Sequence, residues 1–232
     1  KPVITSEEIL SYVPDSRTYC QIDTIQILNI DSTNIQPSHW LTIASAIEAH
    51  YDRYDGFVIT HGTDTMAYTA AALSYLIQHS RKPIVITGSQ RPIDMENTDA
   101  RTNLADSLRF ASDPRAHDVN IVFDGKVIDG THGVKMKTRS MDAFYSVNAP
   151  EAAHIVNGRI VYNPAYMQMI CGKTVDRNRD VCEESHLKAE FMGHTCLNGM
   201  QKTETGKRNL YMHADTSMCQ DIIVLKLFPG MP

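Results

Sequence analysis

The feature that most constrains the fold of this chain is a strand followed at once by a helix within residues 54–73. The apolar, β-branched run from Phe57 to Thr60 indicates a buried strand. After Gly62, the residues Thr63-Asp64-Thr65 lead into the helical pattern of residues 66–73. Thr63 and Asp64 therefore lie where the carboxyl end of a strand meets a helix N-terminus, which is the usual place for a ligand in an open α/β sheet. Thr and Asp also cap helices, so a purely structural role suits them equally well.

Strand and helix patterns alternate along most of the chain. We expect strands at residues 24–30, 56–60, 83–87, 119–123 and near 127–128. Helices are expected after the capping box Thr5-Ser6-Glu7-Glu8, after Pro37, from about 65 to 79 and from about 99 to 111. Strands that alternate with helices through short loops predict an α/β fold with three layers, in which a mostly parallel sheet carries helices on both faces.

Composition excludes several classes of function. The formal net charge of −5 argues against a protein that binds the phosphate backbone of nucleic acids. No apolar run approaches the ~20 residues that a membrane helix needs, so we expect no membrane partner. The five cysteines form no Cys-x-x-Cys pair, and their spacing matches no standard zinc site, so we expect no metal and no cofactor. Free reduced thiols suit a reducing compartment, which favours a cytoplasmic location.

Polar residues with chemical potential follow several of the expected strands. They are found in the loops Asp31-Ser32-Thr33, Thr63-Asp64-Thr65 and Ser89-Gln90-Arg91, and in the glycine-containing stretch 129–138 that carries Lys135. Each residue alone also fits a structural role: Ser32 suits a turn, Lys135 a solvated surface, and Gln90-Arg91 a hydrogen-bonding pair. His61 is expected to end a strand by packing and hydrogen bonding, and His132 to be a loop residue.

Taken together, these stretches resemble the L-asparaginase family of amidohydrolases, the bacterial and archaeal-type enzymes with a threonine nucleophile. The likeness extends over most of the chain, and its most specific part is His61-Gly62-Thr63-Asp64-Thr65 at a strand–helix junction. The other matching stretches are Asn29-Ile30-Asp31-Ser32, Thr87-Gly88-Ser89-Gln90-Arg91-Pro92, Asp99-Ala100-Arg101-Thr102-Asn103-Leu104, Val127-Ile128-Asp129-Gly130 leading to Lys135, and Ser146-Val147-Asn148.

The resemblance implies a chemistry for these residues. The family hydrolyses a side-chain amide through an acyl-enzyme on threonine, and a neutral hydroxyl needs a base to become a nucleophile. By resemblance, Thr63 is that nucleophile, Lys135 removes or polarises its proton, and Asp64 binds the α-ammonium group of the substrate. Ser32 and the Thr63 backbone would bind its α-carboxylate, and the Ser89 backbone would contact the amide that is cleaved. The substrate so implied is L-asparagine.

The resemblance also predicts how the chain is organised. We expect residues 1–190 to form an asparaginase-type N-terminal catalytic domain, 191–220 a linker, and 221–232 the first strand of a smaller C-terminal α/β domain. The family's first strand, with a Gly-Gly-Thr loop, has no counterpart here, because no two glycines of this chain are adjacent. We therefore expect a piece of a longer enzyme whose sheet lacks that strand. The family implies a homo-oligomer, a dimer or tetramer, in which a neighbouring protomer completes the site.

Two other functions stay open. One is the asparaginase-like component of an archaeal-type glutamyl-tRNA amidotransferase, which releases ammonia for a partner. The other is a truncated relative without catalysis that keeps the pocket to bind an amino acid. The missing Gly-Gly-Thr loop motivates the second alternative.

Overall fold

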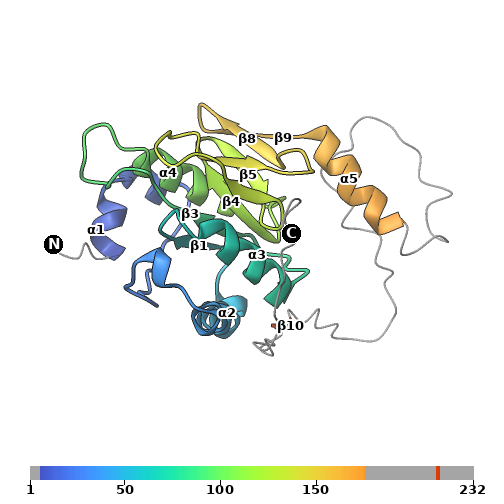
Figure 1. The fold of residues 1–232 in the computed structure, drawn as a ribbon, viewed down its shortest axis with the longest axis horizontal. Helices are drawn as coiled ribbons and strands as arrows, with labels where there is room; N and C mark the ends of the chain where they lie inside the picture. The colour runs from blue at the N-terminus through green and yellow to red at the C-terminus, as the bar shows by residue number, and fades with distance from the viewer. Residues whose placement is uncertain (1–5, 176–212, 215–232) are drawn as a thin grey trace, which may run out of the picture.

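The computed structural model describes residues 6–175 and 213–214, and Figure 1 shows how their elements are arranged. The helices are α1 (Ser6–Ser11), α2 (Pro37–His50), α3 (Met66–Leu76), α4 (Ala100–Ala111) and α5 (Pro164–Val175). The strands are β1 (Phe57–Thr60), β2 (Ile77–Gln78), β3 (Ile84–Thr87), β4 (Val119–Phe123), β5 (Lys126–Asp129), β6 (Gly133–Lys135), β7 (Phe144–Ser146), β8 (Ala153–Val156), β9 (Arg159–Tyr162) and β10 (His213–Ala214). Three short 3-10 helices lie at Pro14–Thr18, Ser32–Asn34 and Tyr51–Arg53. None of the described helices is long and apolar enough to cross a membrane.

The central sheet has the strand order β1-β3-β4-β5-β8-β9. β1, β3 and β4 are parallel, whereas β4 to β9 pair antiparallel through β5 and β8. The parallel strands fit the sequence, because β3 and β4 are mostly apolar and are buried along their whole length rather than at alternate residues. The hairpin of β6 and β7 forms a separate two-stranded sheet. The predicted α/β class is confirmed. In the central sheet the parallel strands β1, β3 and β4 lie beside the antiparallel strands β5, β8 and β9.

Helices cover both faces of this sheet. Ile84 and Ile86 of β3 pack in one core cluster with residues of α2 and α3. Val85, between them, packs in a second cluster with Phe110 of α4. Because successive side chains of a strand point to opposite faces, α2 and α3 lie on one face and α4 on the other, as Figure 1 also shows. These two packed interfaces make the three layers that the alternation predicts.

Most predicted elements are confirmed, and one is wrong. The helices at α1, α2, α3 and α4 and the strands at β1, β3, β4 and β5 lie within a few residues of the expected ranges. Residues 24–30, in contrast, form no strand. An apolar run becomes a strand only where its backbone finds a partner, and here a cavity separates the run from the free edge of β1. Ile25 remains 56% exposed as a result.

α3 ends at Leu76, earlier than the predicted 79, for a visible reason. Ile77 and Gln78 leave the helix to pair with β10, and His79 adopts a positive φ of 58°. The strands β6 to β9 and helix α5 were not predicted. The predicted linker at 191–220 and the predicted strand at 221–232 lie outside the described residues, apart from the two residues of β10.

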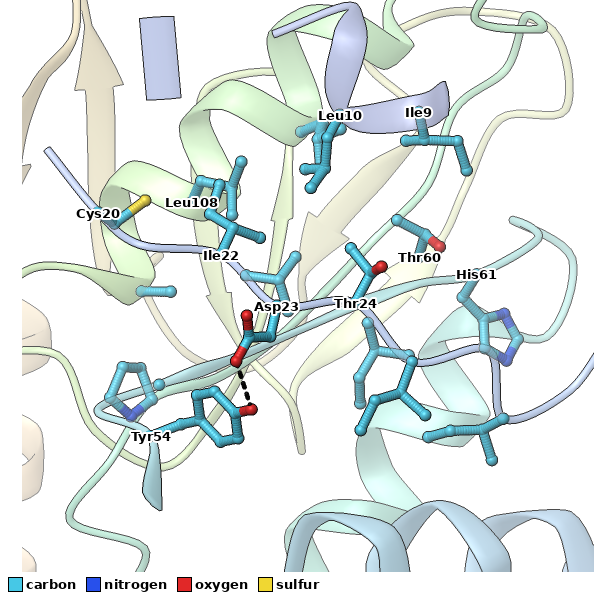
Figure 2. A pocket seen from close by; sticks show the side chains of 18 of the residues that line it. Ile9, Leu10, Cys20, Ile22, Asp23, Thr24, Tyr54, Thr60, His61 and Leu108 are labelled. Carbon is cyan, nitrogen blue, oxygen red and sulfur yellow. Dashed lines mark hydrogen bonds between the residues drawn. The ribbon is translucent and has the colours of Figure 1, made fainter. Parts of the chain in front are cut away.

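A cavity of about 1080 Å³ lies between residues 20–30 and the edge strand β1. Figure 2 shows Leu10 of α1 and Leu108 of α4 lining one end of it, and Thr60 and His61 bordering the other. Tyr54 donates a hydrogen bond of 2.7 Å to Asp23 across it. Among the described residues, β1 pairs with β3 alone, so its other edge faces this cavity.

Candidate active site

The predicted site residues come together at the carboxyl ends of β1 and β3. Thr63 and Asp64 lie between β1 and α3, and Ser89 lies in the loop after β3. Lys135 is the last residue of β6. Parallel neighbouring strands deliver the two loops to the same edge of the sheet, and the β6–β7 hairpin brings the lysine there from elsewhere in the chain.

Lys135 contacts both predicted site residues of the β1–α3 loop. Its Nζ lies 2.7 Å from Thr63 Oγ1 and 2.7 Å from Asp64 Oδ1. The lysine side chain is 14% exposed, whereas that of Asp64 is 60% exposed. The arrangement therefore has a shielded amine against a hydroxyl, with a carboxylate open to solvent beside them. An amine that has released its proton could take the hydroxyl proton at this distance.

The structure excludes the capping role for Thr63 and Asp64. The N-cap of α3 is Thr65, and no side chain caps that helix. Thr65 Oγ1 donates instead to the carbonyl oxygen of Ser32, at 2.7 Å. The side chains of Thr63 and Asp64 bond to Lys135 instead, so the strand–helix junction directs both side chains towards the lysine and not towards the N–H groups of the helix.

Ser32 lies directly against the same loop. It is 7% exposed, and a Cβ placed on Gly62 would come within 2.5 Å of its Oγ. Glycine is needed at position 62 to allow this approach. Asp31 fixes the turn before it by accepting hydrogen bonds from the backbone N–H and the hydroxyl of Thr33, and these bonds lower the pKa of Asp31. Ser32 thus joins Thr63 and Asp64 at one site, as predicted.

The loop after β3 is pressed against the loop after β1. A Cβ on Gly88 would come within 2.3 Å of the carbonyl oxygen of His61, and the His61 N–H donates to Thr87 O at 2.8 Å. Ser89, the next residue, uses its hydroxyl to donate to Arg91 O at 2.7 Å. The hydroxyl proton of Ser89 is therefore used within its own loop.

His61 is a structural residue of the junction, as expected. Its Nδ1 lies 2.6 Å from the carbonyl oxygen of Gly62, which only accepts, so Nδ1 carries the proton. In the neutral ring Nε2 carries no proton, so Thr69 Oγ1 donates to it at 2.9 Å and itself accepts from the indole N–H of Trp40. Burial lowers the pKa of His61, which favours the neutral ring that this network requires. His132 bonds to Val147 O and lies in a loop, also as expected.

Three residues support the site from behind, and none of them was among the predicted site residues, although Gln90 was expected to form hydrogen bonds. Gln90 reaches from Thr63 to the loop after Lys135, and Asp99 and Asn103 bind the loop that carries Gln90. One signal was available: Asp99 and Asn103 lie four residues apart on one helical face, and the buried Phe110, seven residues after Asn103, continues that face. Buried polar residues on an apolar face require partners. No group of three or more His, Cys, Asp or Glu side chains in the described residues is placed to hold a metal ion.

Comparison with known proteins places this geometry in a family context. A family model described as asparaginase, N-terminal, matches residues 1–167. The L-asparaginase of Thermococcus kodakarensis is 40% identical over 162 residues, which cover 69% of this chain and 49% of that protein. One chain of the glutamyl-tRNA(Gln) amidotransferase of Pyrococcus abyssi is 38% identical over 170 residues, covering 69% of this chain and 39% of that one.

A solved structure agrees with these sequence relatives. The probable cytoplasmic L-asparaginase from Campylobacter jejuni matches with a TM-score of 0.66 and 31% identity, over 69% of this chain and 52% of that one. The chain spans about half the length of the asparaginases it matches, and less of the amidotransferase chain.

Proposed function

Because the chain belongs to the asparaginase family, we propose that the full-length protein hydrolyses L-asparagine to L-aspartate and ammonia through an acyl-enzyme on Thr63. The single observation that carries this proposal is the contact of Lys135 Nζ with Thr63 Oγ1 and Asp64 Oδ1. It supplies a nucleophile, a base and an anionic binding group within one cluster.

The proposed reaction has two steps. Thr63 Oγ1 attacks the side-chain amide carbon as its proton passes to the neutral amine of Lys135. The C–N bond then breaks, and the amide nitrogen takes that proton from Lys135 and leaves as ammonia. Water then attacks the ester, giving aspartate and free Thr63. In the resting structure the ammonium of Lys135 donates to both neighbours. In the proposed complex, the α-ammonium group of the substrate takes the place of the Lys135 ammonium beside Asp64.

The difference in exposure between Asp64 and Lys135 supports this division of roles. Asp64, with a 60% exposed side chain, can receive a substrate cation from solvent, while Lys135 is shielded. Ser32, buried beside Gly62, is proposed to bind the α-carboxylate together with backbone N–H groups of the loop before α3. The Ser89 backbone is proposed to contact the scissile amide.

The domain organisation is part of the proposal. We propose that residues 1–190 form the catalytic domain, that 191–220 form a linker, and that 221–232 begin a C-terminal domain. In the full-length protein a further strand would pair with the free edge of β1 and fill the cavity of about 1080 Å³ beside it. We also propose a homo-oligomer in which a neighbouring protomer completes the site, and a cytoplasmic location.

The test is ammonia release by the full-length natural protein from L-asparagine, L-glutamine and D-asparagine, with Thr63→Val as the control. We expect L-asparagine to be hydrolysed by the natural protein and not by the variant. Failure of all three substrates with a well-folded protein would overturn the proposal. Tight amino-acid binding without turnover would then favour a non-catalytic binding protein.

A second function is favoured by one observation, the 38% identity with a chain of the glutamyl-tRNA(Gln) amidotransferase. Such a protein would release ammonia for a partner enzyme. Glutamine hydrolysis that appears only with the partner and charged tRNA would favour this function over asparagine hydrolysis. Hydrolysis of free L-asparagine by the isolated protein would exclude it as the main activity.

A further inference from the structure

Asp99 is a buried carboxylate held by N–H donors alone. It is 8% exposed and lies at the N-terminus of α4. Its oxygens accept from the backbone N–H of Gln90 at 2.9 and 3.1 Å and from that of Arg91 at 3.0 Å. The ion pairs of the described residues do not include Asp99. Hydrogen bonds to an ionised acceptor are roughly twice as strong as neutral ones, so this carboxylate fixes the backbone at residues 90 and 91.

Asn103, one helical turn later, binds the other end of the same loop. Its Nδ2 donates to Gly88 O at 3.0 Å and to Asp99 at 3.2 Å, and its Oδ1 accepts from the Asp124 N–H at 2.9 Å. Asn103 itself is 1% exposed, so its amide group makes these bonds from a buried position. Together, Asp99 and Asn103 bind the loop 88–91 to helix α4.

The side chain that this loop carries reaches the proposed catalytic pair. Gln90 Oε1 lies 3.4 Å from Thr63 Oγ1, and Gln90 Nε2 donates to Ser140 O at 3.0 Å. Ser140 belongs to the loop between β6, which ends in Lys135, and β7. The amide of Gln90 therefore spans the gap between the nucleophile's loop and the lysine's loop, and its backbone is the part that Asp99 fixes.

We infer that Asp99 is a positioning residue that acts through Gln90 to hold Thr63 and Lys135 in their reactive contact. This inference rests on the proposed function for its effect on turnover, but not for its effect on structure. With Gln90 held, the hydroxyl proton of Thr63 has an acceptor at Oε1, and the oxygen stays in contact with Lys135. Without Gln90, the loop that carries Thr63 and the loop that follows Lys135 no longer have a side chain in common.

The first test is a double-mutant cycle on the full-length protein with Asp99→Asn and Gln90→Met. Asparagine replaces an acceptor with a donor facing two N–H groups, and methionine keeps the length of glutamine without its polar atoms. We expect each variant to lower kcat by about 10- to 100-fold with little change in KM, because small displacements of reacting groups have effects of this size. The double variant should be no worse than the more damaged single variant by more than about threefold. Effects that multiply would overturn the inference, since they would mean that Asp99 acts independently of Gln90.

Asp94→Asn is the matched control, because it removes an exposed carboxylate five residues away in the same segment. It should leave kcat and KM within about twofold, as surface substitutions usually do. Should Asp99→Asn fail to fold, Gln90→Met decides alone: a kcat within about twofold of the natural protein would overturn the inference, and a loss of about tenfold supports it.

Amide hydrogen exchange tests whether Asp99 and Gln90 hold these loops, and it requires no catalytic activity. In the natural protein the Gln90 and Arg91 N–H groups should exchange more slowly than those of residues 94–97. In Gln90→Met these two should stay protected, while the amides of residues 137–140 exchange faster. Unchanged exchange at residues 137–140 would show that Gln90 does not hold this loop, and would overturn the inference. If the natural protein hydrolyses no amide, the proposed function fails, but amide exchange still decides whether Gln90 joins the two loops.

Discussion

Lys135 Nζ lies 2.7 Å from Thr63 Oγ1 although the two residues are 72 positions apart in the chain. The lysine is held there from the core. Lys135 pairs with Phe144 across the β6–β7 hairpin, and Phe144 is 1% exposed and packs on Phe123 of β4 with ring centroids 4.8 Å apart. The packing of the β6–β7 hairpin on the main sheet thus places the backbone of Lys135 near Thr63.

Removing the hydroxyl of Thr63 should abolish turnover without unfolding the protein. Thr63→Val has nearly the same shape but no nucleophile, so we expect kcat to fall by about 10³-fold or more. Thr63→Ser keeps the hydroxyl and should retain a measurable fraction of kcat. Ammonia release measures both, and the exposed Thr102→Val of α4 is the control. Near-normal turnover in Thr63→Val would remove the assignment of the nucleophile.

Lys135→Met should produce a similar loss by a different route. The side chain keeps its length, but no group can take the hydroxyl proton, and general-base effects are about 10²- to 10⁴-fold. Lys137→Met is the matched control, because that lysine pairs with Asp142 rather than with Thr63. Its kcat should change by less than about threefold. Equal losses in the two lysine variants would mean that the general charge of the loop matters and not the contact with Thr63.

Asp64→Asn should damage substrate binding more than chemistry. The isosteric amide keeps the shape of the loop but removes the charge proposed to bind the α-ammonium group. Hydrogen bonds to charged groups contribute about 1.5–3 kcal/mol, which corresponds to a rise in KM of roughly 10- to 100-fold. Steady-state kinetics with L-asparagine give the two constants separately. A fall in kcat at unchanged KM would contradict the binding role.

The parts of the fold that the sequence predicts are those determined by local pattern. Runs rich in β-branched residues predicted β3 and β4, and both strands are buried along their whole length. Residues 24–30 have a similar apolar content but form no strand, because strand formation also needs a neighbouring backbone, which a sequence pattern does not reveal. β6 and β7, at three residues each, were too short to give a periodic signal.

The candidate site divides in the same way. Thr63 and Asp64 were predictable because they follow a strong strand signal and precede a helix. The proximity of Lys135 was expected only through family resemblance, since nothing in its local sequence reveals that a hairpin turns it towards β1. Gln90 and Asp99 were missed as a pair because their contact joins a side chain to backbone N–H groups, and such a contact leaves no charge pattern in the sequence.

Gly88→Ala should separate the two site loops. Its Cβ would meet the backbone oxygen of His61 at 2.3 Å, which no side-chain rotation can relieve. Gly56→Ala is the matched control, since its Cβ would meet the backbone oxygen of Ala111 at 2.6 Å, away from the site. We expect both to lower the free energy of unfolding by about 1–3 kcal/mol, the cost typical of forced overpacking. Only Gly88→Ala should also lower kcat per folded molecule, by about tenfold or more. Equal kcat values in the two variants would show that the contact between the loops does not matter for turnover.

Asp106 makes the native state less stable as the pH rises. Burial in α4 raises its pKa from 3.8 to about 6, against the opposing effect of Arg109. Between these two values the native state keeps a proton that the unfolded chain has released, so the free energy of unfolding contributed by this group falls through the window and stays low above it. Asp106→Asn cannot ionise, so it should match the natural protein below about pH 4 and exceed it by about 1–3 kcal/mol at about pH 7.5. Urea unfolding at about pH 4, 5, 6 and 7.5 measures the difference, with the exposed Asp94→Asn as the control. A difference between Asp106→Asn and the natural protein that is the same at every pH would contradict the assigned titration.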